Sequence, residues 1–104
     1  MKSPTLAVQS PGVYAADLNA EQLSALFCDI ESCGQVREIL VKREPTHHVH
    51  PDESVSLRQG RRQLENGSIL ALQIRYAFGS AVWWDTLLRR PTGIALVRIQ
   101  APSS

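Results

Sequence analysis

The densest group of possible metal ligands lies in the segment EPTHHVHPDE, where His47, His48 and His50 are followed by Asp52. In an extended loop, residues two apart point the same way, so His48 and His50 could bind one ion. Imidazole and carboxylate groups suit zinc, nickel or non-haem iron. A closed site needs more ligands, for which Asp52 is a candidate, and the alternative is a solvated polar loop. We expect no resident cofactor, and metal or small-molecule binding by this loop is an alternative function.

The two cysteines, Cys28 and Cys33, are five residues apart in a segment with helical periodicity. Five residues of an α-helix turn through about 500°, so the two thiols would point about 140° apart. This spacing fits neither the CxxC redox motif nor the usual zinc-binding patterns. The GxSxG, P-loop, GxGxxG and HExxH motifs are absent from the sequence. No convincing catalytic set emerges, and a non-catalytic protein is favoured.

Trp83, Trp84 and Asp85 lie together in a run of alternating residues that is typical of a β-strand. Neighbouring residues of a strand face opposite sides of a sheet, so one indole points into the core and the other away from it. We predict that Trp84 lies in the core and that Trp83 and Asp85 share the open face. Arg75, on the preceding strand, would stack on Trp83 or pair with Asp85. A tryptophan on an open sheet face is a candidate anchor for a partner, unless a tail or loop covers it.

Charge is distributed unevenly along the chain. Residues 1–53 hold eight acidic and four basic residues, whereas residues 54–104 hold two acidic residues and seven arginines. This asymmetry indicates an anionic partner, two halves that fold against each other, or like subunits that dock acid to base. Arg89 and Arg90 follow the tryptophans closely, and we include them in the candidate binding surface.

The mixture of arginine and aromatic residues in the second half is also typical of single-stranded nucleic-acid binding. The isoelectric point is 7.9, below the value of about 9 expected for such a domain. The RRM submotif and the KH GxxG loop are absent. Nucleic-acid binding therefore remains a second alternative.

The chain has 104 residues, of which 43% are hydrophobic and 20% charged, as expected for one globular domain spanning residues 1–104. No apolar run is long enough to cross a bilayer, and the first residues do not resemble a signal peptide. We expect a soluble, cytoplasmic protein that does not bind membranes. Residues 1–16 and 101–104 are expected to be irregular tails.

The elements of the first half are read from capping and periodicity. Asn19 and Gln22 predict a capping box at the start of a helix over residues 20–33. Residues 36–43 are rich in β-branched side chains and predict a strand near a sheet edge. Residues 54–65 fit a helix better than an edge strand, although Gly60 weakens the helical pattern.

From residue 68 onward the hydrophobic pattern has period two and predicts a three-stranded meander. Turns are expected at residues 77–80 and 90–93. The fold class is therefore α+β, with two layers. Its largely antiparallel sheet contains the C-terminal meander and one earlier strand, and two helices cover one face. The earlier strand could be a parallel neighbour of the meander.

The segment LQIRYAFGSAVWWDTLLRRPTGIALVRI resembles the end of a family of small uncharacterised bacterial proteins, which has a similar strand, WDTL segment and glycine turn. The resemblance covers roughly residues 57–99. It implies a bacterial origin and a conventional soluble domain, and it transfers no activity. From the residues themselves, we expect a binding or accessory domain that acts through an open sheet face around Trp83. Its partner would be itself, as a homodimer, or another protein.

Overall fold

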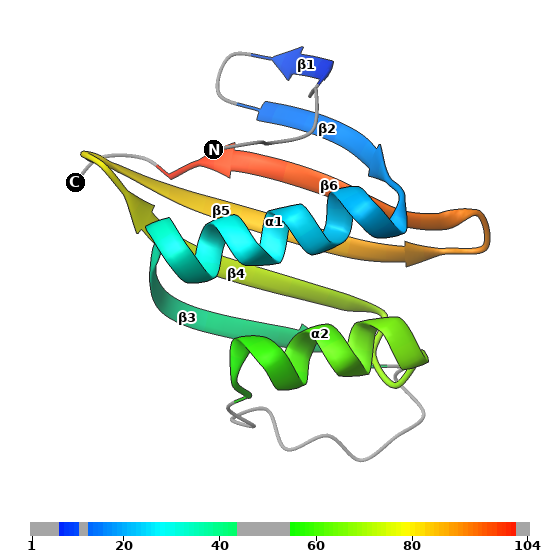
Figure 1. Cartoon of the computed structure of the whole chain (residues 1–104). Coiled ribbons are helices and arrows are strands. Elements are labelled where there is room, and N and C mark those ends of the chain that lie inside the picture. Colours follow the sequence, from blue (N-terminus) through cyan, green and yellow to red (C-terminus); the bar gives the residue numbers. More distant parts are fainter. Residues whose placement is uncertain (1–6, 11–12, 44–54, 102–104) are drawn as a thin grey trace.

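The computed structural model describes residues 7–10, 13–43 and 55–101. These residues form one antiparallel sheet and two helices that lie on the same side of it (Figure 1). The elements follow in the order β1 (Ala7–Ser10), β2 (Val13–Leu18), α1 (Ala20–Cys33), β3 (Gln35–Lys42), α2 (Leu57–Asn66), β4 (Ala71–Phe78), β5 (Ala81–Arg90) and β6 (Gly93–Gln100). The predicted two-layer α+β fold, with helices on one face, is confirmed.

The sheet has six strands in the order β1-β2-β6-β5-β4-β3. Every described pairing is antiparallel, so the expectation of a parallel neighbour for residues 36–43 was wrong. β3 pairs with β4 and forms one edge of the sheet, as predicted. The interpretation of residues 1–16 as an irregular arm was wrong for residues 7–10 and 13–16, because β1 and β2 extend the sheet beyond β6. Residues 1–6 and 11–12 lie outside the described residues.

α1 begins and ends where the sequence predicts. The side chain of Asn19 accepts a hydrogen bond from the backbone N–H of Gln22 at 2.8 Å, and the Gln22 side chain accepts one from the backbone N–H of Asn19 at 2.9 Å. This capping box satisfies amides that the first turn leaves free. The buried residues of the helix, Leu23, Leu26, Phe27 and Ile30, form one stripe that faces the sheet.

α2 confirms the choice of helix over edge strand for this part of the chain. Ser56 caps its start through a second capping box with Gln59, and Gly67 ends it in the left-handed conformation, with φ 84°. A Cβ atom on Gly60 would lie 2.8 Å from the Cδ1 atom of Leu72 in the sheet. The glycine that weakened the helical pattern therefore lets α2 approach β4 closely.

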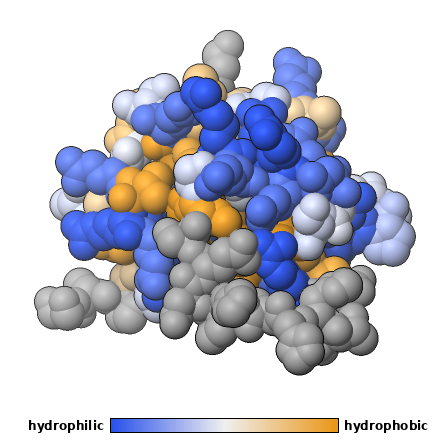
Figure 2. All heavy atoms as spheres, turned by 90° about the horizontal axis from the view of Figure 1, so that it is seen from below, coloured by the Kyte–Doolittle hydropathy of each residue, from blue (hydrophilic) through white to orange (hydrophobic). Residues whose placement is uncertain are grey.

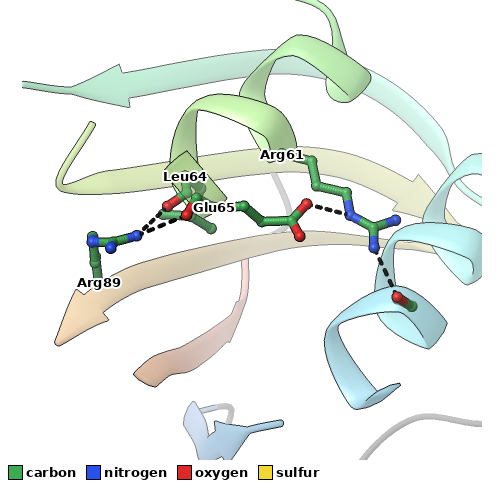
Figure 3. Close-up of polar contacts among 5 residues, drawn as sticks. Arg61, Leu64, Glu65 and Arg89 are labelled. Atoms are coloured by element: carbon green, nitrogen blue, oxygen red, sulfur yellow. Dashed lines mark hydrogen bonds and ion pairs between the residues drawn. The ribbon is translucent and has the colours of Figure 1, made fainter. Parts of the chain in front are cut away.

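Two arginines tie α2 to its neighbours (Figure 3). Arg89 of β5 donates hydrogen bonds to the backbone oxygens of Leu64 and Glu65, at 2.7 and 3.2 Å. These carbonyls belong to the last turn of α2, where a cation is favourable. Arg61 of α2 donates to the carboxylate of Glu65 at 2.9 Å and to the Ser24 hydroxyl of α1 at 2.7 Å.

The core lies between the helices and the sheet. Its buried members include the α1 stripe, Leu64 of α2, and side chains from the central strands: Leu72, Ile74, Tyr76, Leu87 and Leu96. On β4 these residues alternate with Gln73 and Arg75, which point to the other face. The alternation fixes which side chains of the sheet are available for recognition.

Candidate functional site: the open face of the sheet

The two tryptophans lie on the faces opposite to those predicted. Trp83 pairs across β4 and β5 with the buried Tyr76 and packs against the core, whereas Trp84 pairs with Arg75. Asp85 is fully buried on the helix side. The prediction that Trp83 and Asp85 form the open face, with Trp84 in the core, was therefore wrong. Its physical error was to treat a carboxylate as a group that must face water.

Asp85 is buried because it has two partners on the helix side. Arg98 donates two hydrogen bonds to the two carboxylate oxygens, from Nε and Nη2, each at 2.9 Å. The Tyr76 hydroxyl donates a third bond, to Oδ2, at 2.9 Å. The paired, bidentate geometry compensates the desolvation of both charges.

The same cluster shifts two pKa values. Burial and the adjacent Asp85 carboxylate raise the pKa of Tyr76 well above its ordinary value of 10.0. Burial by itself lowers the pKa of Arg98, but the hydrogen bonds and negative charge of Asp85 outweigh it and raise that pKa overall. At neutral pH the phenol of Tyr76 is thus uncharged beside the Asp85–Arg98 ion pair. Because these groups satisfy one another, the cluster is a structural element of the core rather than a reactive site.

Sequence reasoning missed this cluster, although a signal was present. Asp85 and Arg98 lie in adjacent strands of a hairpin, and the turn at residues 91–92 places them directly opposite each other. Arg90 pairs with Gly93 across this turn, so counting back along both strands pairs Asp85 with Arg98. Both residues then fall in the alternating set that faces the helices. An opposite-charge pair at facing positions is the feature that lets a charged residue occupy a core position.

The face away from the helices, called here the open face, has three rows of side chains running across five strands. The register of β3, β4, β5, β6 and β2 defines them. The first row is Lys42, Ala71, Leu88, Ala95 and Asp17; the second is Leu40, Gln73, Thr86, Val97 and Ala15; the third is Glu38, Arg75, Trp84, Ile99 and Val13. Within the described part of the chain, neither helix and no other element covers this face (Figure 1).

The open face is apolar at its centre and charged at its edges. Trp84, Thr86, Leu88, Val97 and Ile99 are each half-buried by their neighbours, and Leu40 on the edge strand remains 38% exposed. Lys42 and Glu38 lie on the edge strand β3, and Asp17 lies on β2. Figure 2 views the molecule from the side of β3 and α2, where hydrophobic surface lies between hydrophilic residues along this edge. An apolar centre with a polar rim is the composition of a protein interface.

The polar groups around Arg75 on the open face satisfy one another. The Gln73 amide donates to the Thr86 hydroxyl at 3.0 Å and accepts from Arg75 Nε at 2.9 Å. Arg75 also pairs with Glu38 at 3.2 Å, and its guanidinium lies 4.4 Å from the centroid of the Trp84 ring. Covering this part of the face would therefore leave few hydrogen-bonding groups buried without a partner. The main free-energy cost of burying polar residues is thus removed.

A shallow depression of about 330 Å³ lies at one side of the open face. It is lined by residues of β3, β4 and β5, including Leu40, Ala71, Gln73 and Leu88. The small side chain of Ala71 leaves this space, since its row neighbours are larger. The depression is too open to enclose a small molecule, and its shape suits a protruding side chain of another chain.

The remaining predicted site residues are dispersed. Arg75 lies on the open face, and Arg90 lies at the end of that face. Arg89, which was also predicted to belong to the binding surface, instead caps α2 on the helix side. Arg98 is buried with Asp85, and Arg61 is held by Glu65 and Ser24. Arg58, Arg61 and Arg62 lie together on α2, but the other arginines named above do not join them in one basic surface. Nucleic-acid binding stays a prediction.

His47, His48, His50 and Asp52 fall outside the described residues, so metal binding by that loop also stays a prediction. Within the described ranges, no group of three histidine, cysteine or acidic residues is placed to hold a metal ion. Cys28 and Cys33 are free and exposed on α1. The two thiols thus take no part in the open face.

Among the helices of the described residues, none is both long and apolar enough to cross a membrane. Comparison of the chain with protein-family models, with curated proteins and with solved structures gives no match. The resemblance of residues 57–99 to a bacterial family therefore remains an expectation. The function is inferred from the open face alone.

Proposed function

We propose that the protein is a non-catalytic binding domain that uses the open face as its interface with another protein chain. The observation that carries this proposal is a sheet face that no described element covers, where an apolar centre around Trp84 is bounded by charged residues on β3 and β2. Helices cover the opposite face, so the open face is the broad surface of the sheet that the described residues leave for recognition.

The chemistry of the face favours a protein over a small ligand. Tryptophan and arginine are enriched where binding energy concentrates, and here the two stack on each other at the third row. The stack holds the indole in one orientation, so less conformational entropy is lost when a partner covers it. The polar groups beside it are already bonded within the face, which suits contact with a flat, apolar partner surface.

Site-specific photo-cross-linking tests the proposal. A benzophenone amino acid replaces Leu88 on the open face or, as a matched control, Ser24 on the exposed side of α1. We expect cross-linked protein adducts from the Leu88 position in cells that produce the protein, and none from the Ser24 position. The additional change Trp84→Asp should abolish the adduct while the far-ultraviolet circular dichroism stays native. Equal cross-linking from both positions, or none from Leu88, would overturn the proposed function.

A further inference from the structure

Two opposite charges lie at the two ends of the first row of the open face. Lys42 is on β3 and Asp17 is on β2, four strands away in the same register. Both side chains are exposed, and within the described residues neither has an ion-pair partner. Glu38, by contrast, is already paired with Arg75. The unpaired charges of Lys42 and Asp17 are therefore complementary to each other but too far apart to meet within one chain, at about 19 Å for four strand spacings.

A second copy of the chain can bring these charges together. β5 is the central strand of the three rows, with β4 and β3 on one side and β6 and β2 on the other. Two copies can stack with their open faces against each other. A two-fold axis parallel to β5, midway between the two sheets, then places the β3 side of one copy over the β2 side of the other. It places Lys42 of each copy opposite Asp17 of the other, so one arrangement forms two identical ion pairs. Such self-complementarity is what a two-fold interface requires.

An axis running across the strands fits less well. It would exchange the first and third rows, so that Lys42 faced Glu38 of the other copy and Asp17 faced Val13. Glu38 is already engaged by Arg75, and Asp17 would be left against an aliphatic side chain. Burying an unpaired carboxylate costs free energy, and this arrangement is therefore disfavoured.

The shape of the face agrees with the axis along β5. The depression lies over β4, next to Ala71 and Gln73. The symmetry places β6 of the other copy over this position, with Ala95 and Val97 in the same two rows. Val97 of each copy can thus enter the depression of the other, while Trp84 and Leu88 lie near the axis and contact their own counterparts. Arg90 follows Leu88 at the end of the hairpin, where its side chain can extend into solvent.

The size of the face is that of a stable interface. Five strands about 4.8 Å apart, with a mean length of eight residues or about 26 Å, present about 600 Å² in projection. Protruding side chains make the accessible area of such a face larger than its projection. A standard interface buries about 800 Å² on each partner, so the two areas are comparable. Two sheets stacked with nearly parallel strands are also a common packing arrangement.

We propose that the partner of the open face is a second copy of this chain, in a face-to-face dimer whose two-fold axis lies along β5 and whose register is set by reciprocal Lys42–Asp17 ion pairs. This inference rests on the proposed function and names the partner of the same surface.

Charge reversal combined with sedimentation tests the dimer and its register. We expect wild-type protein to dimerise, and Asp17→Lys or Lys42→Asp to raise the dissociation constant about tenfold, since each reversal replaces two attractive pairs by two repulsive ones. The double variant Asp17→Lys with Lys42→Asp should return to within about threefold of wild type, because both pairs form again with exchanged signs. Glu21→Lys on α1 and Arg62→Asp on α2 make the same changes in net charge on the helix side, and they should leave the constant unchanged.

The outcomes separate this inference from the function on which it rests. Dimers that respond equally to the open-face and helix-side reversals, or a double variant as weak as the single ones, would overturn the register and its axis. A wild-type monomer whose Leu88 position cross-links to a different protein would overturn self-association and leave the proposed function standing. A monomer with no cross-link from Leu88 would overturn both.

Discussion

Asp85, Arg98 and Tyr76 show at the level of single residues how charge is accommodated in this small core. The carboxylate has no exposed surface, and all three of its hydrogen bonds come from the guanidinium and the phenol. The cluster also determines which tryptophan faces outward, because placing Asp85 inward on β5 turns Trp84 to the open face. The stability of the cluster and the identity of the recognition face are therefore linked.

Removing the charge of Asp85 should destabilise the protein strongly. Asp85→Asn leaves the guanidinium of Arg98 buried without a counter-ion, and we expect the free energy of unfolding to fall by about 3 kcal/mol. Glu31→Gln, at an exposed position of α1 away from the open face, should change it by less than about 0.5 kcal/mol. Urea unfolding measures both values.

A companion variant distinguishes the ion pair from simple packing. Replacing the whole cluster by apolar residues, as Asp85→Leu, Arg98→Met and Tyr76→Phe, should recover most of the stability lost in Asp85→Asn, because no charge or hydroxyl is then left unpaired. A triple variant that is as unstable as the single one would contradict this account of the cluster.

Tyr76 should make the protein less stable in alkali. Its folded-state pKa is raised above the ordinary value of 10.0 by burial and by Asp85, so above pH 10 the unfolded chain loses this proton more readily than the folded chain. Stability is then fully present below pH 10 and falls as pH rises toward the folded pKa, by up to about 1.4 kcal/mol per pH unit from this group. Tyr76→Phe should flatten this part of the stability–pH curve, as measured by urea unfolding between pH 9 and 11. An unchanged slope in Tyr76→Phe would assign the alkaline loss to other groups.

α2 illustrates at the level of elements how tertiary packing overrides helix propensity. In an exposed helix, changing a glycine to alanine stabilises by about 1 kcal/mol. Gly60 faces the sheet, and a Cβ there would come within 2.8 Å of Leu72, a fully buried residue. We therefore expect Gly60→Ala to destabilise by about 1–3 kcal/mol, the usual cost of overpacking.

A double-mutant cycle with Leu72→Val tests the cause. Shortening Leu72 removes the contacted methyl group, so the cost of Gly60→Ala should be clearly smaller in the Leu72→Val background than in wild type. Chemical denaturation provides all four free energies. A cost that does not depend on residue 72 would show that the close approach of α2 and β4 is not responsible.

The elements also show what sequence reasoning can and cannot predict. Capping residues specify α1 and α2 locally, and period-two alternation specifies the meander, so these elements were predicted closely. β2 was missed because Ala15 and Ala16 give a weak alternation, and its pairing with β6 joins segments far apart in the chain. The faces of β5 were assigned wrongly because the partner of Asp85 is thirteen residues away, at Arg98. Local signals do not reveal long-range compensation of a buried charge.

At the scale of the whole molecule, the two faces of the sheet have different tasks. The helix side carries the hydrophobic core, the buried ion pair and the arginine contacts that fix α2. The open face carries the Trp84–Arg75 stack and polar groups that hydrogen-bond to one another. It also carries Lys42 on β3 and Asp17 on β2, which have no ion-pair partner within the described residues. Because most structural contacts lie on the first face, substitutions on the second should affect association far more than folding.

The most direct test of self-association through the open face is sedimentation equilibrium of Trp84→Asp against Phe78→Asp. Phe78 is 39% exposed but follows the inward pattern of β4 at the hairpin end, so it supplies an exposed hydrophobic control away from the open face. We expect wild type and Phe78→Asp to be dimers and Trp84→Asp to be a monomer with native circular dichroism. A wild-type monomer, or equal association of the two variants, would contradict the account.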